Sequence, residues 1–173
     1  YKVDADTAYA TYKELVKRGC LGVVDNMGIA GEDSFDNVDY FGEFINTNRL
    51  IIKAPNIKSM SWASRLVNVE ILSLEDSQLE DLSWIKEMKK LKWVYMSNSS
   101  FSDLSVLSEH ENIDMLDING TKVSDISFIE NFANLEQLLI ATCPIKDYSP
   151  LFTTKATLKY LEIDKRALEE IGE

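Results

Sequence analysis

Few residues in this sequence are of the types that enzymes use for nucleophilic or metal-assisted chemistry. The 173 residues include one histidine, His110, and two cysteines, Cys20 and Cys143. A single histidine cannot supply a multi-histidine metal site, nor the base and proton shuttle that most hydrolases need. No glycine-rich loop of the P-loop or dinucleotide-binding type is present either. We therefore expect a chain that is not an enzyme and that holds no cofactor.

An acidic segment is the only other candidate for metal chemistry. Its carboxylates are those of Glu32, Asp33, Asp36 and Asp39. They lack the D-x-[DN]-x-[DN]-G spacing that places oxygen ligands around one calcium ion, so no metal is expected. His110 lies in a polar turn between two glutamates, with no nucleophile paired to it by the sequence pattern. It is predicted to be a solvated histidine on the convex side of the molecule.

Charge and length restrict the class of partner. Lysine and arginine number 18 against 29 aspartates and glutamates, which gives a net charge of −11. Such a surface repels polyanions, so nucleic acid is not expected as a partner. No apolar run approaches the roughly 20 residues of a membrane-spanning helix, so membrane insertion is not expected. With 45% apolar residues the chain is predicted to form one continuous domain.

A repeat of 22 residues organises most of the chain. The same pattern of apolar positions begins at Leu91, at Ile113 and at Leu135. Steps of 22 residues backward, and one step of 23 forward, find further copies. Together they predict six strand-bearing units: Thr47–Ile52, Val69–Leu74, Leu91–Met96, Ile113–Ile118, Leu135–Ile140 and Leu158–Ile163.

Other positions of the repeat hold as well. Two are apolar and predicted to face inward: the eleventh (Ile57, Leu79, Phe101, Val123, Ile145, Leu168) and the fourteenth (Met60, Leu82, Leu104, Ile126, Tyr148, Ile171). The thirteenth is aspartate in four units (Asp81, Asp103, Asp125, Asp147), and the fifteenth is serine in five (Ser61, Ser83, Ser105, Ser127, Ser149). Aspartate and serine can bond to local backbone groups and fix the same turn in each coil.

With these positions in view, the chain resembles the bacterial internalin-type leucine-rich repeats. Their units follow L-x-x-L-x-I-x-x-T-x-V-x-D-I-S-x-L, and Met115–Ile129 reads MLDINGTKVSDISFI. The resemblance implies an α/β solenoid, a right-handed superhelix with a concave parallel β-sheet, and a protein-binding role. It also favours a secreted or cell-surface location over the cytoplasm, and a monomer is expected.

The ninth position departs from the family pattern. Pro55, Ser77, Ser99 and Cys143 replace the usual asparagine or threonine, which weakens the case for a regular polar ladder there. Because the family pattern admits cysteine at this position, the resemblance implies that Cys143 is a buried structural thiol. Several stacked coils would separate Cys143 from Cys20, so a disulfide between them is not expected.

The two ends of the chain are predicted to differ from the repeats. Residues 1–46 form an N-terminal cap and a degenerate first repeat, and residues 47–173 form the leucine-rich repeats, the last one incomplete. Asp4–Arg18 is predicted to be an amphipathic helix that ends at Gly19, and Leu21–Val24 a short strand. Gly28–Tyr40 is either an acidic loop or the degenerate repeat. The incomplete last coil leaves its apolar positions partly uncovered.

The concave sheet is the predicted binding face. The third, fifth and seventh residues of each unit point outward from a strand whose fourth and sixth residues point inward. Apolar and aromatic residues gather at these outward positions, and tryptophan, tyrosine and methionine are common at interface centres. The predicted partner-binding residues are Ile71, Trp93, Tyr95, Met115, Asp117, Gln137, Leu139, Tyr160 and Glu162.

The leading hypothesis is a non-catalytic module that binds a protein on this concave face. Carboxylates surround the predicted patch, among them Asp114, Asp117 and Glu136, so a partner with a basic surface would suit it. Two alternatives remain open. The chain would be an accessory, substrate-recognition domain of a larger enzyme, or the neutralising partner of a basic toxin.

Overall fold

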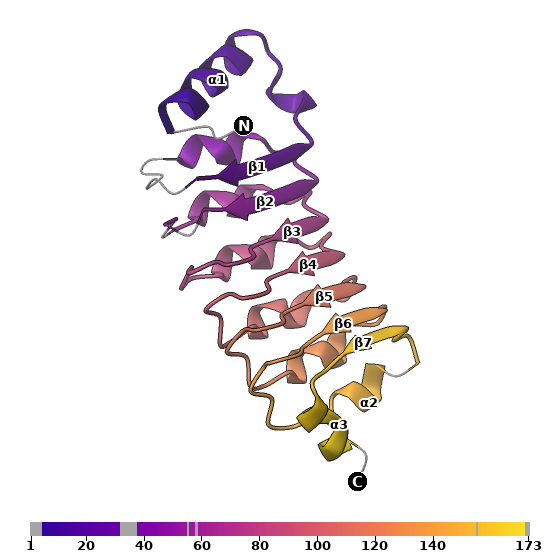
Figure 1. Ribbon diagram of the computed structural model, residues 1–173. Helices are drawn as coiled ribbons and strands as arrows, with labels where there is room; N and C mark the ends of the chain where they lie inside the picture. Colours follow the sequence, from indigo (N-terminus) through magenta and orange to yellow (C-terminus); the bar gives the residue numbers. More distant parts are fainter. Residues whose placement is uncertain (1–4, 32–37, 55, 58, 155, 172–173) are drawn as a thin grey trace.

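The computed structural model describes residues 5–31, 38–54, 56–57, 59–154 and 156–171. Its centre is one parallel sheet in which seven strands follow one another in sequence order (Figure 1). The strands are β1 Asn26–Ala30, β2 Arg49–Lys53, β3 Ile71–Ser73, β4 Trp93–Tyr95, β5 Met115–Asp117, β6 Gln137–Leu139 and β7 Tyr160–Glu162. All six predicted strand units therefore contain a strand, as the repeat predicted.

Short helices return the chain from one strand to the next. Six are 3₁₀ helices: η1 Leu21–Val23, η2 Asp39–Glu43, η3 Ser61–Arg65, η4 Ser83–Glu87, η5 Ser105–Glu109 and η6 Ser127–Asn131. The α-helices are α1 Ala5–Lys17, α2 Leu151–Thr154 and α3 Lys165–Ile171. The core lies between the sheet and these helices, and the fourth-position side chains from Leu50 to Leu138 are fully buried in it.

The repeated aspartates fix the turn before η4, η5, η6 and α2. In four coils the Oδ1 atom of the thirteenth residue accepts a hydrogen bond of 2.8 Å from the backbone N–H of the fifteenth. These bonds satisfy a backbone donor at the start of a helix, where no carbonyl of the helix is available. The prediction that aspartate and serine set a uniform turn is confirmed. It explains why successive coils stack in register.

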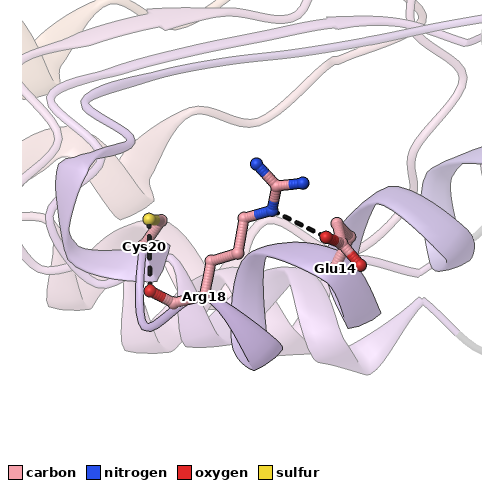
Figure 2. A network of polar contacts seen from close by, with 3 residues as sticks. All are labelled: Glu14, Arg18 and Cys20. Atoms are coloured by element: carbon pink, nitrogen blue, oxygen red, sulfur yellow. Dashed lines mark hydrogen bonds and ion pairs between the residues drawn. The ribbon is translucent and has the colours of Figure 1, made fainter.

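The helix α1 lies beyond the first strand, at the N-terminal end of the solenoid (Figure 1). Its last turn is held by an ion pair of 2.6 Å between Arg18 Nε and Glu14 Oε1, and the Cys20 thiol donates to the Arg18 carbonyl (Figure 2). Gly19 ends the helix with φ of 66°, a left-handed conformation that glycine adopts without strain. Tyr12 links α1 to the first coil by donating to Glu43 Oε2 at 2.7 Å.

Two predictions for the ends are wrong. The first strand is Asn26–Ala30, whereas Leu21–Val23 forms the 3₁₀ helix η1. The strand begins later because Met27 pairs in register with Leu50, so the degenerate repeat keeps a spacing close to that of the others. In the last coil Leu168 is 61% exposed and Ala167 is buried instead, so the inward direction predicted for Leu168 is wrong. Its exposure agrees with the prediction that the last coil is partly uncovered. The helix α3 replaces the repeat geometry there and turns Leu168 outward.

The prediction for His110 is also wrong, because only 1% of this residue is exposed. Its Nε2 atom lies 3.0 Å from the carbonyl oxygen of Ile85 in the preceding coil. Since a carbonyl only accepts, Nε2 carries the proton. The polar residues of this turn predicted that it lies at the surface, and Glu109 and Glu111 are indeed exposed. The sequence did not reveal that the imidazole points inward between η4 and η5.

Some predictions fall on residues outside this description. Glu32, Asp33 and Asp36 of the acidic segment and Asp4 of the N-terminal helix are among them. Asp39 begins η2, and both Val38 and Phe41 are buried beside it. Of the two alternatives for Gly28–Tyr40, the described parts therefore correspond to the degenerate first repeat. Among the helices that the structure describes, none is long and apolar enough to cross a membrane.

A candidate protein-binding face

The side of the sheet that faces away from the core is called the outer sheet face here; it is the predicted concave face. The strand register lines up equivalent residues across it. The third positions form a row that runs Arg49, Ile71, Trp93, Met115, Gln137 and Tyr160. The fifth positions form a second row that runs Ile51, Ser73, Tyr95, Asp117, Leu139 and Glu162. All nine predicted binding residues thus belong to two adjacent rows.

Exposure along the first row is uneven. Trp93 is 44% exposed and Tyr160 is 51% exposed, as expected for outward positions. Met115 is only 8% exposed, so its expected exposure is wrong. Trp93 and Met115 are register partners on adjacent strands, and the Trp93 side chain lowers the pKa of Asp114, the residue before Met115.

The second row holds a polar network that the sequence did not reveal. The Asn119 side chain donates to Glu162 Oε1 at 2.8 Å and accepts from the Ala141 N–H at 2.6 Å. The Asn119 N–H donates in turn to Asp117 Oδ1 at 3.0 Å. These contacts tie β5 to β7 across β6. Asn119 occupies the seventh position of its repeat, which was predicted to face outward. This position is the signal from which its place on the outer sheet face could have been predicted.

Burial and like charges act together on the aspartates of this face. Burial raises the pKa of Asp117, and the carboxylates of Glu75 and Glu162 raise it further, against the lowering effect of the Asn119 N–H. The pKa of Asp114 is raised by burial and by Glu136. In both groups burial is the largest cause, and neighbouring carboxylates add to it.

Two other carboxylates at the second position of the repeat, Glu70 and Glu136, are better compensated. Lys92 Nζ lies 2.7 Å from Glu70 Oε2, and Lys159 Nζ lies 2.6 Å from Glu136 Oε1, in each case between adjacent strands. The hydrogen bond that Lys92 donates to Glu70 lowers the pKa of Glu70 and raises the pKa of Lys92. Among the described residues, Glu70 and Glu136 therefore have a lysine partner, whereas no ion pair includes Asp114, Asp117 or Glu162.

The two cysteines lie in different surroundings, Cys20 partly exposed after α1 and Cys143 in the core. Both are free, and Cys143 is buried, as the resemblance implied. Its thiol donates to the Ile118 carbonyl at 3.0 Å, and burial raises its pKa, which disfavours the nucleophilic thiolate. Ser99 takes an equivalent place two coils earlier and bonds to the Leu74 carbonyl at 2.7 Å. Among the described residues, no group of three or more histidine, cysteine or carboxylate side chains could hold a metal ion.

Comparisons with known proteins agree on the fold. No family model and no curated protein matches the chain. Solved structures do match, among them internalin C2 of Listeria monocytogenes, with TM-score 0.69 and 23% identity over 79% of this chain and 62% of that one. Internalin F of the same bacterium matches with TM-score 0.69 and 23% identity, over 92% of this chain and 54% of that one. A leucine-rich-repeat protein of Leptospira interrogans matches with TM-score 0.73 and 16% identity, over 86% of this chain and 38% of that one.

The chain spans less than two thirds of the length of each of these proteins. The strand order, the 3₁₀ returns and the N-terminal helix all agree with these structures. The chain therefore has the internalin-like leucine-rich-repeat fold.

Proposed function

We propose that this chain is a non-catalytic module that binds a partner protein on the outer sheet face. The observation that carries the proposal is the exposure of Trp93 at the middle strand of the sheet. Tryptophan and tyrosine are enriched among residues that contribute most to protein interfaces. Tyr95 and Leu139 lie half-buried in the adjacent row and extend the apolar surface beside it.

The rigidity of the face supports the same function. Parallel strands about 4.8 Å apart hold the two rows at fixed spacing, so side chains need little reordering on binding. Ile71 and Gln137 flank this centre on β3 and β6. Binding surfaces of this kind are produced by repeat proteins because each coil adds one strand to a continuous surface.

A comparison of affinity with stability tests the proposal. Proteins from the source cells and their medium are captured on the immobilised chain, and each candidate is then purified and titrated. We expect Trp93→Ala to weaken binding by about 2 kcal/mol or more, as the loss of a hot spot does. The urea unfolding midpoint should change much less, because an exposed strand residue contributes little to the core.

Glu109→Gln and Glu111→Gln serve as controls, since both glutamates lie in the turn on the opposite side of the coils. They should leave affinity within about twofold of the unchanged protein, as surface substitutions outside an interface do. Normal binding by the Trp93→Ala variant would exclude the outer sheet face as the site. Equal losses in the glutamate variants would exclude it as well.

A further inference from the structure

Asp117 differs from the other acidic residues on the sheet because its surroundings are partly apolar. The register places Tyr95 on one side of it and Leu139 on the other, each on the adjacent strand. Adjacent strands are about 4.8 Å apart, so these two side chains flank the carboxylate closely. The carboxyl group is half-buried among them.

Two further carboxylates act electrostatically on Asp117: Glu75, two residues after β3, and Glu162, the last residue of β7. Glu162 is held toward β5 by the Asn119 amide, and Glu75 accepts from the Ser73 hydroxyl at 3.2 Å. No ion pair within the described ranges includes Glu75, Asp117 or Glu162. By contrast, Glu70 and Glu136 at the edge of the face are each paired with a lysine.

The charge of this row is therefore complementary to a cation that arrives from outside. A metal ion fits poorly, because the described residues contain no group of three or more histidine, cysteine, aspartate or glutamate side chains that could hold one. A side chain that is cationic at its end and apolar along its stem fits better. Its stem would cover Tyr95 and Leu139, while its charged end meets the carboxylates.

We propose that the outer sheet face accepts an arginine side chain of the partner protein over Asp117, between Tyr95 and Leu139. The inference rests on the proposed function and names the chemistry of the partner at this site. Arginine is favoured over lysine because its planar guanidinium stacks on an aromatic ring and can bind two carboxylate oxygens at once. The weaker hydration of guanidinium also suits a half-buried position.

A small peptide probe tests this inference without the natural partner. Acetyl-Gly-Arg-Gly-amide is titrated to about 50 mM into isotopically labelled protein, since a single side chain binds in the millimolar range. We expect the largest NMR shifts at Tyr95, Asp117, Asn119 and Leu139. The same peptide with citrulline, which is neutral and nearly the same shape, should bind at least about fivefold more weakly.

Asp117→Asn is the decisive variant because an asparagine oxygen can still accept the Asn119 N–H, so the local turn is retained. It should weaken binding of the arginine peptide at least about fivefold, and Glu162→Gln should weaken it by a smaller factor. Glu111→Gln removes the same charge from the opposite side and should change affinity less than about twofold.

Three results would overturn the inference: no saturable shifts on the outer sheet face, equal binding of the citrulline peptide, or equal losses in Asp117→Asn and Glu111→Gln. The last would indicate only general attraction to an acidic protein. These outcomes leave the proposed function standing if Trp93→Ala still weakens the natural partner. If Trp93→Ala has no effect on that partner, the proposed function fails by itself.

Discussion

At the scale of single residues, His110 links the packing of two coils to pH. Its Nε2–H donates to Ile85, while its buried Nδ1 atom has no hydrogen-bond partner in the part of the chain that is described. Burial lowers the pKa of His110 from the ordinary value of 6.5, and the carbonyl oxygens of Ile85 and Leu107 offset this only in part. Lys89 lowers the pKa further, and Glu109 raises it with the smallest effect of the five.

The sign of the resulting pH dependence follows from this shift. The folded state disfavours protonated His110, so its contribution to stability is complete above pH 6.5 and is lost as the pH falls through the lowered pKa. Between about pH 7.5 and about pH 5, we expect the urea midpoint of the unchanged protein to fall more than that of His110→Gln. Glutamine keeps a donor for Ile85 without a titrating ring.

Comparing the unchanged protein with His110→Gln cancels the effect of groups that titrate in the same way in both. Asp114 and Asp117 have raised pKa values, so their protonation favours the folded state as the pH falls, in both proteins alike. If the two midpoints moved in parallel, His110 would not be the cause. At this scale sequence predicted the outward rows but not the burial of single side chains. The positions of His110 and Met115 depend on neighbours in adjacent coils, which a pattern within one coil does not contain.

At the scale of elements, one backbone position recurs just after each central strand. The eighth residue of four successive repeats has a positive φ: 57° at Asp76, 57° at Asn98, 70° at Gly120 and 60° at Thr142. Asparagine, aspartate and glycine adopt this left-handed conformation readily, whereas a β-branched residue does so with strain. Three of the four coils therefore have a residue suited to this conformation, whereas Thr142 adopts it with strain.

Two substitutions at this position should have opposite effects. Thr142→Gly should stabilise the protein by about 0.5–1 kcal/mol, because relief of left-handed strain exceeds the added entropy of an unfolded glycine. Gly120→Ala should destabilise it by about 1–2 kcal/mol, because the backbone at position 120 has φ of 70°, which strains any residue with a Cβ atom. The added Cβ atom would also lie 2.7 Å from Asn98 Oδ1. Urea denaturation measures both. Destabilisation by Thr142→Gly would show that the turn carries no strain.

Elements were predictable wherever the repeat was regular. Each of the strands β2–β7 overlaps one of the six predicted units, and the four aspartate turns repeat one geometry. Both follow because each coil must match its neighbours to bury its apolar edge. Prediction failed at the ends, where η1 and α3 are not constrained by a coil on both sides. Their conformations depend on how each end is covered.

At the scale of the whole molecule, stability is expected to depend on a residue's place along the solenoid. Each coil contacts mainly its two neighbours, so a central coil loses packing on both sides when it is damaged. Leu116 is fully buried in β5, between β4 and β6. Leu161 has the same repeat position in β7 but is 36% exposed, because β7 is the last strand of the sheet.

The same substitution at these two positions should therefore give different results. Leu116→Ala leaves a closed cavity among buried side chains and should cost about 2–5 kcal/mol of unfolding free energy. Leu161→Ala removes a side chain that is already in contact with water and should cost about 1 kcal/mol or less. Urea denaturation gives both values, and amide hydrogen exchange locates the change. In Leu161→Ala the loss of protection should be confined to β7 and α3, whereas in Leu116→Ala it should extend through the central strands. Equal losses from the two variants would mean that the coils unfold as one unit, without the nearest-neighbour dependence expected of a solenoid.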